Sequence, residues 1–141
     1  MKDNFKRRTA GLAITSKTVI IASIVEREAK KDADRPIIAG VYLNRLNSNI
    51  KLDADPTIQY AKGSWAAISV SDYQNVNSPY NTYLHAGLPP GPICNPGLKS
   101  IEATLSPTDT TYFYFLTTPD GQAIYSSTLA EQNANIKKYL R

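Results

Sequence analysis

Two glutamates, Glu26 and Glu28, end a run of apolar residues and are the first candidates for chemistry. Residues 19–25, just before them, read VIIASIV. On a helical wheel of about 100° per residue, Glu26 shares a face with small or apolar side chains, and Glu28 lies about 200° away beside Ile21 and Ile24. Two carboxyl groups placed so far apart around one helix do not serve one site.

Glu26 is the stronger candidate for chemistry of the two. Its small, apolar neighbours leave room beside the carboxyl group and remove water from it, and loss of water raises the pKa of a carboxylic acid. Such a group keeps its proton near neutral pH and delivers it as a general acid. The alternative is that either glutamate pairs with Arg27, Lys30 or Lys31 on a solvated rim, and this is the reading we prefer for Glu28.

Other reactive side chains give weaker signals. Asp53 and Asp55 are candidates for a second glycosidase carboxylate or a calcium loop, but an Asp before Pro56 more often forms a turn or caps a helix. Cys94 and His85 are separated by a proline-rich loop, and a lone cysteine is usually a buried, inert thiol. We therefore expect these residues to be structural.

Aromatic and neutral polar residues gather in the middle third of the chain. Rings with a polar edge suit both sugars and protein cores, and neutral amides and hydroxyls nearby suit carbohydrate or peptide recognition. The rings are those of Tyr60, Trp65, Tyr73, Tyr80 and Tyr83, and the polar groups are Asn81, Thr82 and Asn95.

Composition narrows the possible classes. A chain of 141 residues suffices for one domain. One cysteine and one histidine exclude disulfide frameworks and multi-histidine metal centres, so we expect no metal and no cofactor. No apolar run reaches the roughly 18 residues of a membrane span. The formal net charge is +4, and residues 1–31 carry most of the excess, which leaves nucleic-acid binding through this segment as a minor alternative.

These residues need elements to position them, and the pattern predicts an α+β, mainly helical single domain. A helix that is apolar on all sides is a buried one, which describes the second predicted helix. A Pro-Asp-Gly turn predicts a β-hairpin near the C-terminus, and Thr128 and Glu131 have the spacing of a capping box. The third helix begins at Asp32 or Asp34, with Pro36 near its first position, and runs to about residue 46. The other expected helices span about residues 4–13, 16–30, 57–61, 100–105 and 128–140, with a short one after Ser71; the strands are 112–116 and 122–125, and 87–97 is a shaped loop.

Six motifs occur in order along the chain, and together they resemble the endolytic murein transglycosylase family, also called YceG-like. They are ASIVERE (22–28), VYLNRL (41–46), DPT (55–57), SPYNTY (78–83), GLPPGPI (87–93) and NPG (95–97). The resemblance covers the chain from about Ile14 onward. It implies cleavage of the MurNAc–GlcNAc bond of peptidoglycan without water, leaving a 1,6-anhydro-muramyl end, in cell wall assembly and remodelling.

The resemblance also implies roles for particular residues. It maps the family's catalytic acid onto Glu26 and places the loops 78–83 and 87–97 along a glycan groove. One acid suffices, because the muramyl C6 hydroxyl replaces water as the nucleophile. The expected substrate contacts are Ser78, Tyr80, Asn81, Thr82, Tyr83, Gly87, Asn95 and Gln132.

The chain departs from the family pattern in two ways. The closing helix carries Gln132 where a His is usual, so any ordering role passes to its amide. The usual membrane anchor and LysM-like domain are missing, so we expect residues 1–14 to be a basic remnant of a longer chain and 15–141 to be the catalytic domain. The implied partners are glycan strands and cell wall synthases, at the extracytoplasmic face of the bacterial membrane. A non-catalytic glycan-binding module is the alternative function.

Overall fold

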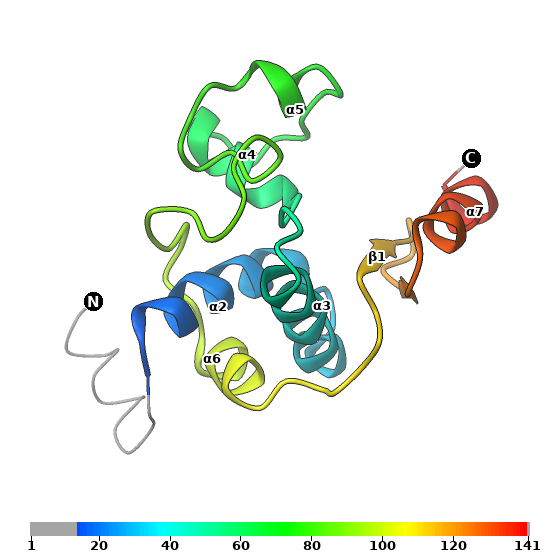
Figure 1. Cartoon of the computed structure of the whole chain (residues 1–141), viewed down its shortest axis with the longest axis horizontal. Coiled ribbons are helices and arrows are strands. Elements are labelled where there is room, and N and C mark those ends of the chain that lie inside the picture. The colour runs from blue at the N-terminus through cyan, green and yellow to red at the C-terminus, as the bar shows by residue number, and fades with distance from the viewer. Residues whose placement is uncertain (1–13, 141) are drawn as a thin grey trace.

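The computed structural model describes residues 14–140, and within them the fold is α+β and mainly helical. Three helices, α2 (Ser16–Glu28), α3 (Arg35–Asn47) and α6 (Leu98–Leu105), pack together as the main body (Figure 1). The helix expected over residues 4–13 lies outside the described residues. No helix in the described part is both long enough and apolar enough to cross a membrane.

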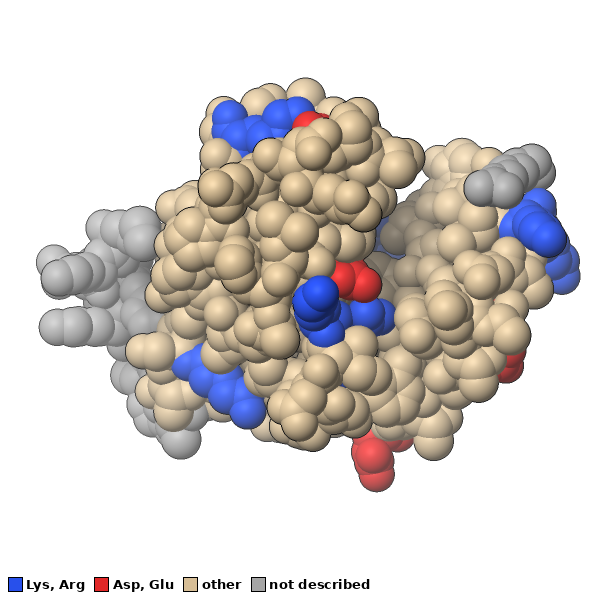
Figure 2. All heavy atoms as spheres, turned by 45° about the horizontal axis from the view of Figure 1, so that its top comes forward, with Lys and Arg blue, Asp and Glu red and all other residues tan. Residues whose placement is uncertain are grey.

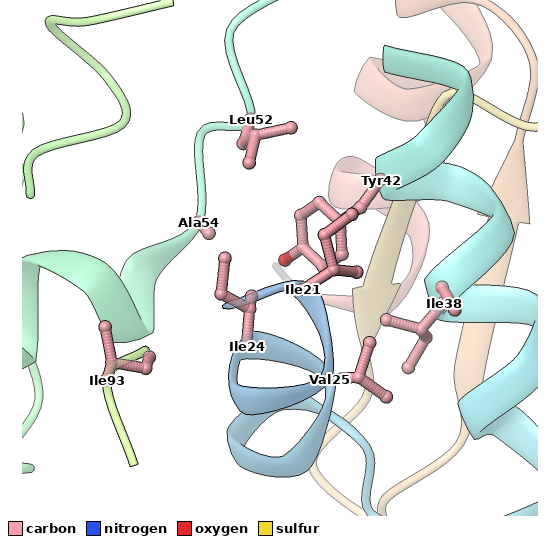
Figure 3. Packing of buried hydrophobic residues seen from close by; sticks show 9 residues of the cluster. Ile21, Ile24, Val25, Ile38, Tyr42, Leu52, Ala54 and Ile93 are labelled. Carbon is pink, nitrogen blue, oxygen red and sulfur yellow. The ribbon is translucent and has the colours of Figure 1, made fainter. Parts of the chain in front are cut away.

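Helix α2 is the buried centre of this body, as predicted. Thr15 caps it by accepting a hydrogen bond from the Thr18 amide, and Ile20 through Val25 are all buried. Figure 3 shows Val25 facing Ile38 of α3, while Ile24 lies on the side of the helix toward Ala54 and Ile93. The helix ends at Glu28 rather than at Lys30, and both glutamates therefore lie in its last turn.

Helix α3 begins at Arg35 with Asp34 as its N-cap residue, which is one of the two starts that the sequence predicts. A short 3-10 turn, η1 (Asp32–Asp34), precedes it, and Pro36 occupies its first turn, where the missing N–H of proline costs nothing. Two side chains near its end, Asn44 and Arg45, hold the segment that leads to the hairpin. Asn44 donates to the carbonyls of Thr110 and Tyr112, both at 2.9 Å, and Arg45 donates to that of Phe113.

The middle of the chain forms a second part above α2, with α4 (Asp55–Lys62) and α5 (Asp72–Asn75) joined by loops (Figure 1). Gly63 ends α4 with a positive φ of 75°, a conformation that glycine adopts without strain. Buried polar groups replace a large apolar core here. Thr82 accepts from the Ala54 amide and shares a hydrogen bond with Thr57.

The C-terminal part is the predicted hairpin followed by a helix. Strands β1 (Tyr114–Thr117) and β2 (Ala123–Ser126) pair antiparallel, with Phe115 opposite Tyr125. Helix α7 (Leu129–Tyr139) begins with the predicted capping box of Thr128 and Glu131. It packs on the hairpin and has no buried residue. In Figure 1 this part stands to one side of the three-helix body.

Candidate active site

A cavity of about 640 Å³ lies between the helical body and the hairpin with α7. Figure 2 shows a hollow between the two parts, with acidic and basic side chains at its edge. One wall comes from the ends of α2, α3 and α4, and the other from residues 113–117 and the apolar face of α7. The cavity opens to solvent between these two walls (Figure 2), so a segment of a longer chain can enter it.

Glu28 projects into this cavity from the last turn of α2. Its Oε2 accepts a hydrogen bond of 3.1 Å from the Tyr42 hydroxyl of α3. Burial, and to a lesser degree the negative charge of Asp55, raises the pKa of Glu28 to about 7, against the opposing effects of Tyr42 and Lys30. A carboxyl group with this pKa holds its proton for about half the time at neutral pH, as a general acid requires.

Asp55 faces the same cavity from the first turn of α4. The Tyr83 hydroxyl donates to its Oδ1, and the Tyr83 ring stacks on Tyr73 with centroids 4.1 Å apart. Burial raises the pKa of Asp55, while the hydroxyls of Tyr83 and Tyr73 act in the opposite direction. The Asp53 carboxylate also lines the cavity, but it is paired with Arg45 at 3.1 Å. Of the three carboxyl groups in the cavity, those of Glu28 and Asp55 form no ion pair with a described residue.

Glu26 points to a different part of the molecule. Its Oε1 accepts hydrogen bonds from the Gly97 amide at 2.8 Å and from the Ser100 hydroxyl at 2.9 Å. Arg35 Nη1 lies 3.7 Å from its Oε2 and donates to Ser100 at 2.8 Å. The prediction that apolar side chains surround the Glu26 carboxyl group is therefore wrong. The groups next to this carboxyl group are two hydrogen-bond donors and the Arg35 guanidinium.

These contacts give Glu26 a structural role. Gly97 is the N-cap residue of α6, and a carboxylate that accepts an unpaired amide at a helix N-terminus stabilises that helix. A Cβ added to Gly97 would lie 3.0 Å from Glu26 Oε1, so any other residue there would push the carboxylate away by a few tenths of an ångström. Glu26 thereby fastens α6 to α2.

The expected substrate contacts divide into two sets. Tyr83 and Gln132 line the cavity. The Gln132 amide bridges the hairpin and α7, because it donates to the Phe115 carbonyl and accepts from Ser126. The residues that do not line the cavity are Ser78, Tyr80, Asn81, Thr82, Gly87 and Asn95.

Within this second set, Asn81 and Thr82 are fully buried and part of the framework. The Asn81 side chain donates to the carbonyls of Tyr73 and Val76 and accepts from the Tyr83 amide. Its hydrogen-bonding capacity is thus spent on the loop that carries Tyr83. The loop 87–97 packs behind α2, where the Ile93 amide and the Cys94 thiol bond to Ser23.

Cys94 and His85 form no contact that would support a nucleophile and base. The Cys94 thiol donates to a carbonyl, and burial together with the charge of Glu26 raises its pKa to about 11. A thiol with this pKa is protonated at neutral pH and is a poor nucleophile. Among residues 14–140 no group of three or more His, Cys, Asp or Glu side chains is placed to hold a metal ion.

The sequence did not predict that Glu28, Tyr42 and Asp55 lie close together. One signal was available, because the helical wheel places Glu28 beside Ile21 and Ile24, which are among the most buried residues of α2. A carboxyl group on the deeply buried face is the one that loses most water. Tyr42 and Asp55 come from two other helices, and their convergence on Glu28 is visible only in the fold.

The pH dependence of Glu28 can be predicted from its raised pKa. A folded-state pKa above the ordinary 4.5 stabilises the fold below pH 4.5, and this stabilisation is lost as the pH rises to about 7. We expect the free energy of unfolding, measured by urea titration from pH 4 to 8, to fall across this range relative to a Glu28→Gln variant. Asp55→Asn removes a negative charge that raises the pKa of Glu28, so the loss of stability should end at a lower pH in this variant. Identical pH profiles for the parent chain, Glu28→Gln and Asp55→Asn would contradict the raised pKa of Glu28.

A buried carboxyl group of raised pKa, with aromatic rings along an open cavity, is typical of enzymes that cleave glycans. A model of the YceG-like family matches residues 1–138, and the chain belongs to this family. This confirms the resemblance found in the sequence motifs.

Similar proteins agree with this membership. The chain is 43% identical over 124 residues to the endolytic murein transglycosylase of Bacillus subtilis, covering 88% of this chain and 34% of that protein. It is 36% identical over 126 residues to the protein of the same name from Streptococcus pneumoniae, covering 85% and 23%. A crystal structure of a yceG-like protein from Listeria monocytogenes superposes with a TM-score of 0.81 at 41% identity, covering 94% of this chain and 43% of that one. The chain thus spans about a quarter to a third of the length of these curated relatives.

Proposed function

We propose that this chain is a lyase that cleaves peptidoglycan glycan strands internally, by lytic transglycosylation, with Glu28 as its acid. The observation that carries the proposal is the position of the Glu28 carboxyl group, bonded to the Tyr42 hydroxyl, in a cavity lined by aromatic rings, where burial raises its pKa to about 7. The two curated relatives are named endolytic murein transglycosylases, which supports peptidoglycan as the glycan. We assign the role of the acid to Glu28 and not to Glu26, because the Glu26 carboxylate is bound by Gly97, Ser100 and Arg35.

The reaction needs one group that first gives and then takes a proton. Protonated Glu28 donates to the glycosidic oxygen between N-acetylmuramic acid and N-acetylglucosamine as the C1–O bond breaks. The Glu28 carboxylate then accepts the proton of the muramyl C6 hydroxyl as O6 bonds to C1. The product is a 1,6-anhydro-muramyl end, and Glu28 is protonated again.

Asp55 has a supporting part in this reaction. Its carboxylate in the same cavity offsets the positive charge that develops at C1. The Tyr83 hydroxyl fixes the orientation of this carboxylate and holds it with one hydrogen bond. The negative charge of this carboxylate also raises the pKa of Glu28, in addition to the larger effect of burial.

Asp55 also favours a second candidate function, hydrolysis. In an ordinary glycosidase a second carboxylate activates water or attacks the sugar, and Asp55 is a carboxylate that faces the same cavity as Glu28. The same residues then yield a reducing end in place of an anhydro end. A glycan-binding module without turnover would yield no new ends.

Mass spectrometry of purified glycan strands after digestion separates these functions. We expect 1,6-anhydro-muramyl ends from strands cut internally, and no such ends with the Glu28→Gln chain. Reducing muramyl ends would identify a hydrolase and overturn the transglycosylase proposal. Strands that stay uncut would overturn both enzymatic functions and support a glycan-binding module.

The cellular setting is part of the proposal. We place the enzyme at the extracytoplasmic face of the bacterial cytoplasmic membrane, where peptidoglycan is built and remodelled, alongside cell wall synthases. The support is the substrate named in the curated relatives.

A further inference from the structure

Arg27 and Trp65 form a feature at the edge of the cavity that the proposed reaction does not use. The Arg27 guanidinium lies 3.8 Å above the centroid of the Trp65 ring. Arg27 also lines the cavity that contains Glu28. Trp65 belongs to the loop after α4, is 41% exposed and is held in place through Gln59, whose side-chain amide donates to the carbonyls of Trp65 and Ala66.

The stacking fixes the guanidinium but leaves its hydrogen-bond donors free. A guanidinium lying over an aromatic ring uses its face, while its N–H groups point outward in its own plane. Within residues 14–140, the side chains of Arg35, Arg45, Lys62 and Lys99 form ion pairs with acids, but that of Arg27 does not. Its side chain makes no hydrogen bond to any described residue either. The Arg27 guanidinium is therefore held in place by Trp65, and its planar fork of N–H donors binds no acid among the described residues.

We infer that Arg27, held on Trp65, is a subsite that binds a carboxylate carried by a muramyl unit of the glycan. A planar fork of N–H donors matches a carboxylate in two parallel hydrogen bonds. Arg27 is adjacent to Glu28 in the chain, so the anion belongs to the sugar at the cleaved bond or to its neighbour. The inference rests on the proposed function for its substrate.

This inference predicts a substrate preference. Muramyl units bear stem peptides that end in carboxylates, and these distinguish peptidoglycan from neutral glycans. Strands with free peptide carboxylates should be cleaved with a kcat/KM about tenfold above strands whose carboxylates have been converted to amides, the effect expected of one charge-assisted hydrogen-bonded pair. The difference should lie in KM, because the anion is held equally in the ground and transition states.

The test compares these two substrates with variants of the 141-residue chain. Arg27→Gln should lose the preference by lowering kcat/KM only on the carboxylate strands. Arg27→Lys, which keeps the charge without the fork, should retain part of it. Trp65→Ala should lose part of the preference, and Trp65→Phe should restore it. Arg27 and Trp65 are both exposed, so these changes leave the core intact.

A third substrate locates the anion. Strands stripped of peptide by an amidase keep one lactyl carboxylate on each muramyl unit. The lactyl carboxylate is free only on these strands, because the peptide otherwise occupies it in an amide bond. Dependence on Arg27 with these strands therefore shows that the fork also accepts a carboxylate at the lactyl position, and independence restricts the ligand to the peptide carboxylates. An equal loss on the carboxylate and amide strands in Arg27→Gln, or no preference in the parent chain, would overturn the inference.

A binding measurement keeps this test separate from the proposed reaction. Co-sedimentation of the Glu28→Gln chain with the same strands, with and without Arg27→Gln, measures affinity without turnover. If the parent chain cleaves no strand, the proposed reaction fails, but the carboxylate preference in binding is still decided. Equal binding to carboxylate and amide strands would then overturn the subsite alone.

Discussion

Glu28→Gln is expected to reduce cleavage of glycan strands by about 10²-fold or more, since general acid catalysis contributes roughly 10²–10⁴. Glutamine keeps the size of the side chain and its acceptor for the Tyr42 hydroxyl, but it has no proton to give. Loss of the buried, raised-pKa group should not unfold the protein. The rate of appearance of new glycan ends, at equal concentrations of folded protein, measures the effect.

Glu26→Gln is the matched comparison, because the two glutamates are two residues apart on the same helix. Its amide oxygen can still accept from Gly97 or Ser100, so we expect activity within a few-fold of the parent and a loss of about 1–2 kcal/mol in the free energy of unfolding. Glu102→Gln, at an exposed site on α6, controls for the change of charge. If Glu26→Gln were inactive while Glu28→Gln stayed active, the acid would be Glu26, as the motifs alone predict.

Asn81→Ala is expected to have the largest effect on stability. The Asn81 side chain is fully buried and makes three hydrogen bonds, so its removal leaves two carbonyls and one amide without partners. Each unsatisfied buried group costs about 1–3 kcal/mol. Tyr73, Val76 and Tyr83 are only partly buried, so we expect the lower end for each of the three groups, which is a total loss of about 3 kcal/mol in urea unfolding.

The same variant separates a framework role from a substrate contact. At a temperature where Asn81→Ala remains folded, we expect KM for glycan strands to change by less than about threefold, because the side chain does not line the cavity. Asn95→Ala, an exposed change on the loop before α6, should leave stability nearly unchanged. A stable Asn81→Ala chain with a strongly raised KM would show instead that Asn81 contacts the glycan, as predicted from the sequence.

Much of the fold could be predicted from the sequence because its signals are local. The buried α2 is visible as an apolar run, the hairpin as a Pro-Asp-Gly turn, and the start of α7 as the pair Thr128 and Glu131. Each depends on residues within a few positions of one another. The 3-10 turn η1 and the end of α2 at Glu28, two residues before the predicted Lys30, were not predicted.

The site was less predictable because its decisive contacts are distant in the chain. The choice between Glu26 and Glu28 depends on Gly97 and Ser100, which meet Glu26 across more than 70 positions, and on Asp55, which meets Glu28 in the cavity. Neutral polar residues on loops were interpreted as ligands for a glycan, and the structure uses Asn81 for its own backbone instead. Composition does not distinguish these two uses of an amide.

The most direct test of Glu28 as the acid is a crystal structure of the Glu28→Gln chain with a bound glycan fragment. We expect the fragment to lie in the cavity between the helical body and the hairpin. Its glycosidic oxygen should lie within hydrogen-bonding distance of the amide that replaces the Glu28 carboxyl group, with Asp55 facing the C1 atom of the muramyl unit. A fragment bound along loops 78–83 and 87–97, with its glycosidic oxygen beside Glu26, would contradict this assignment.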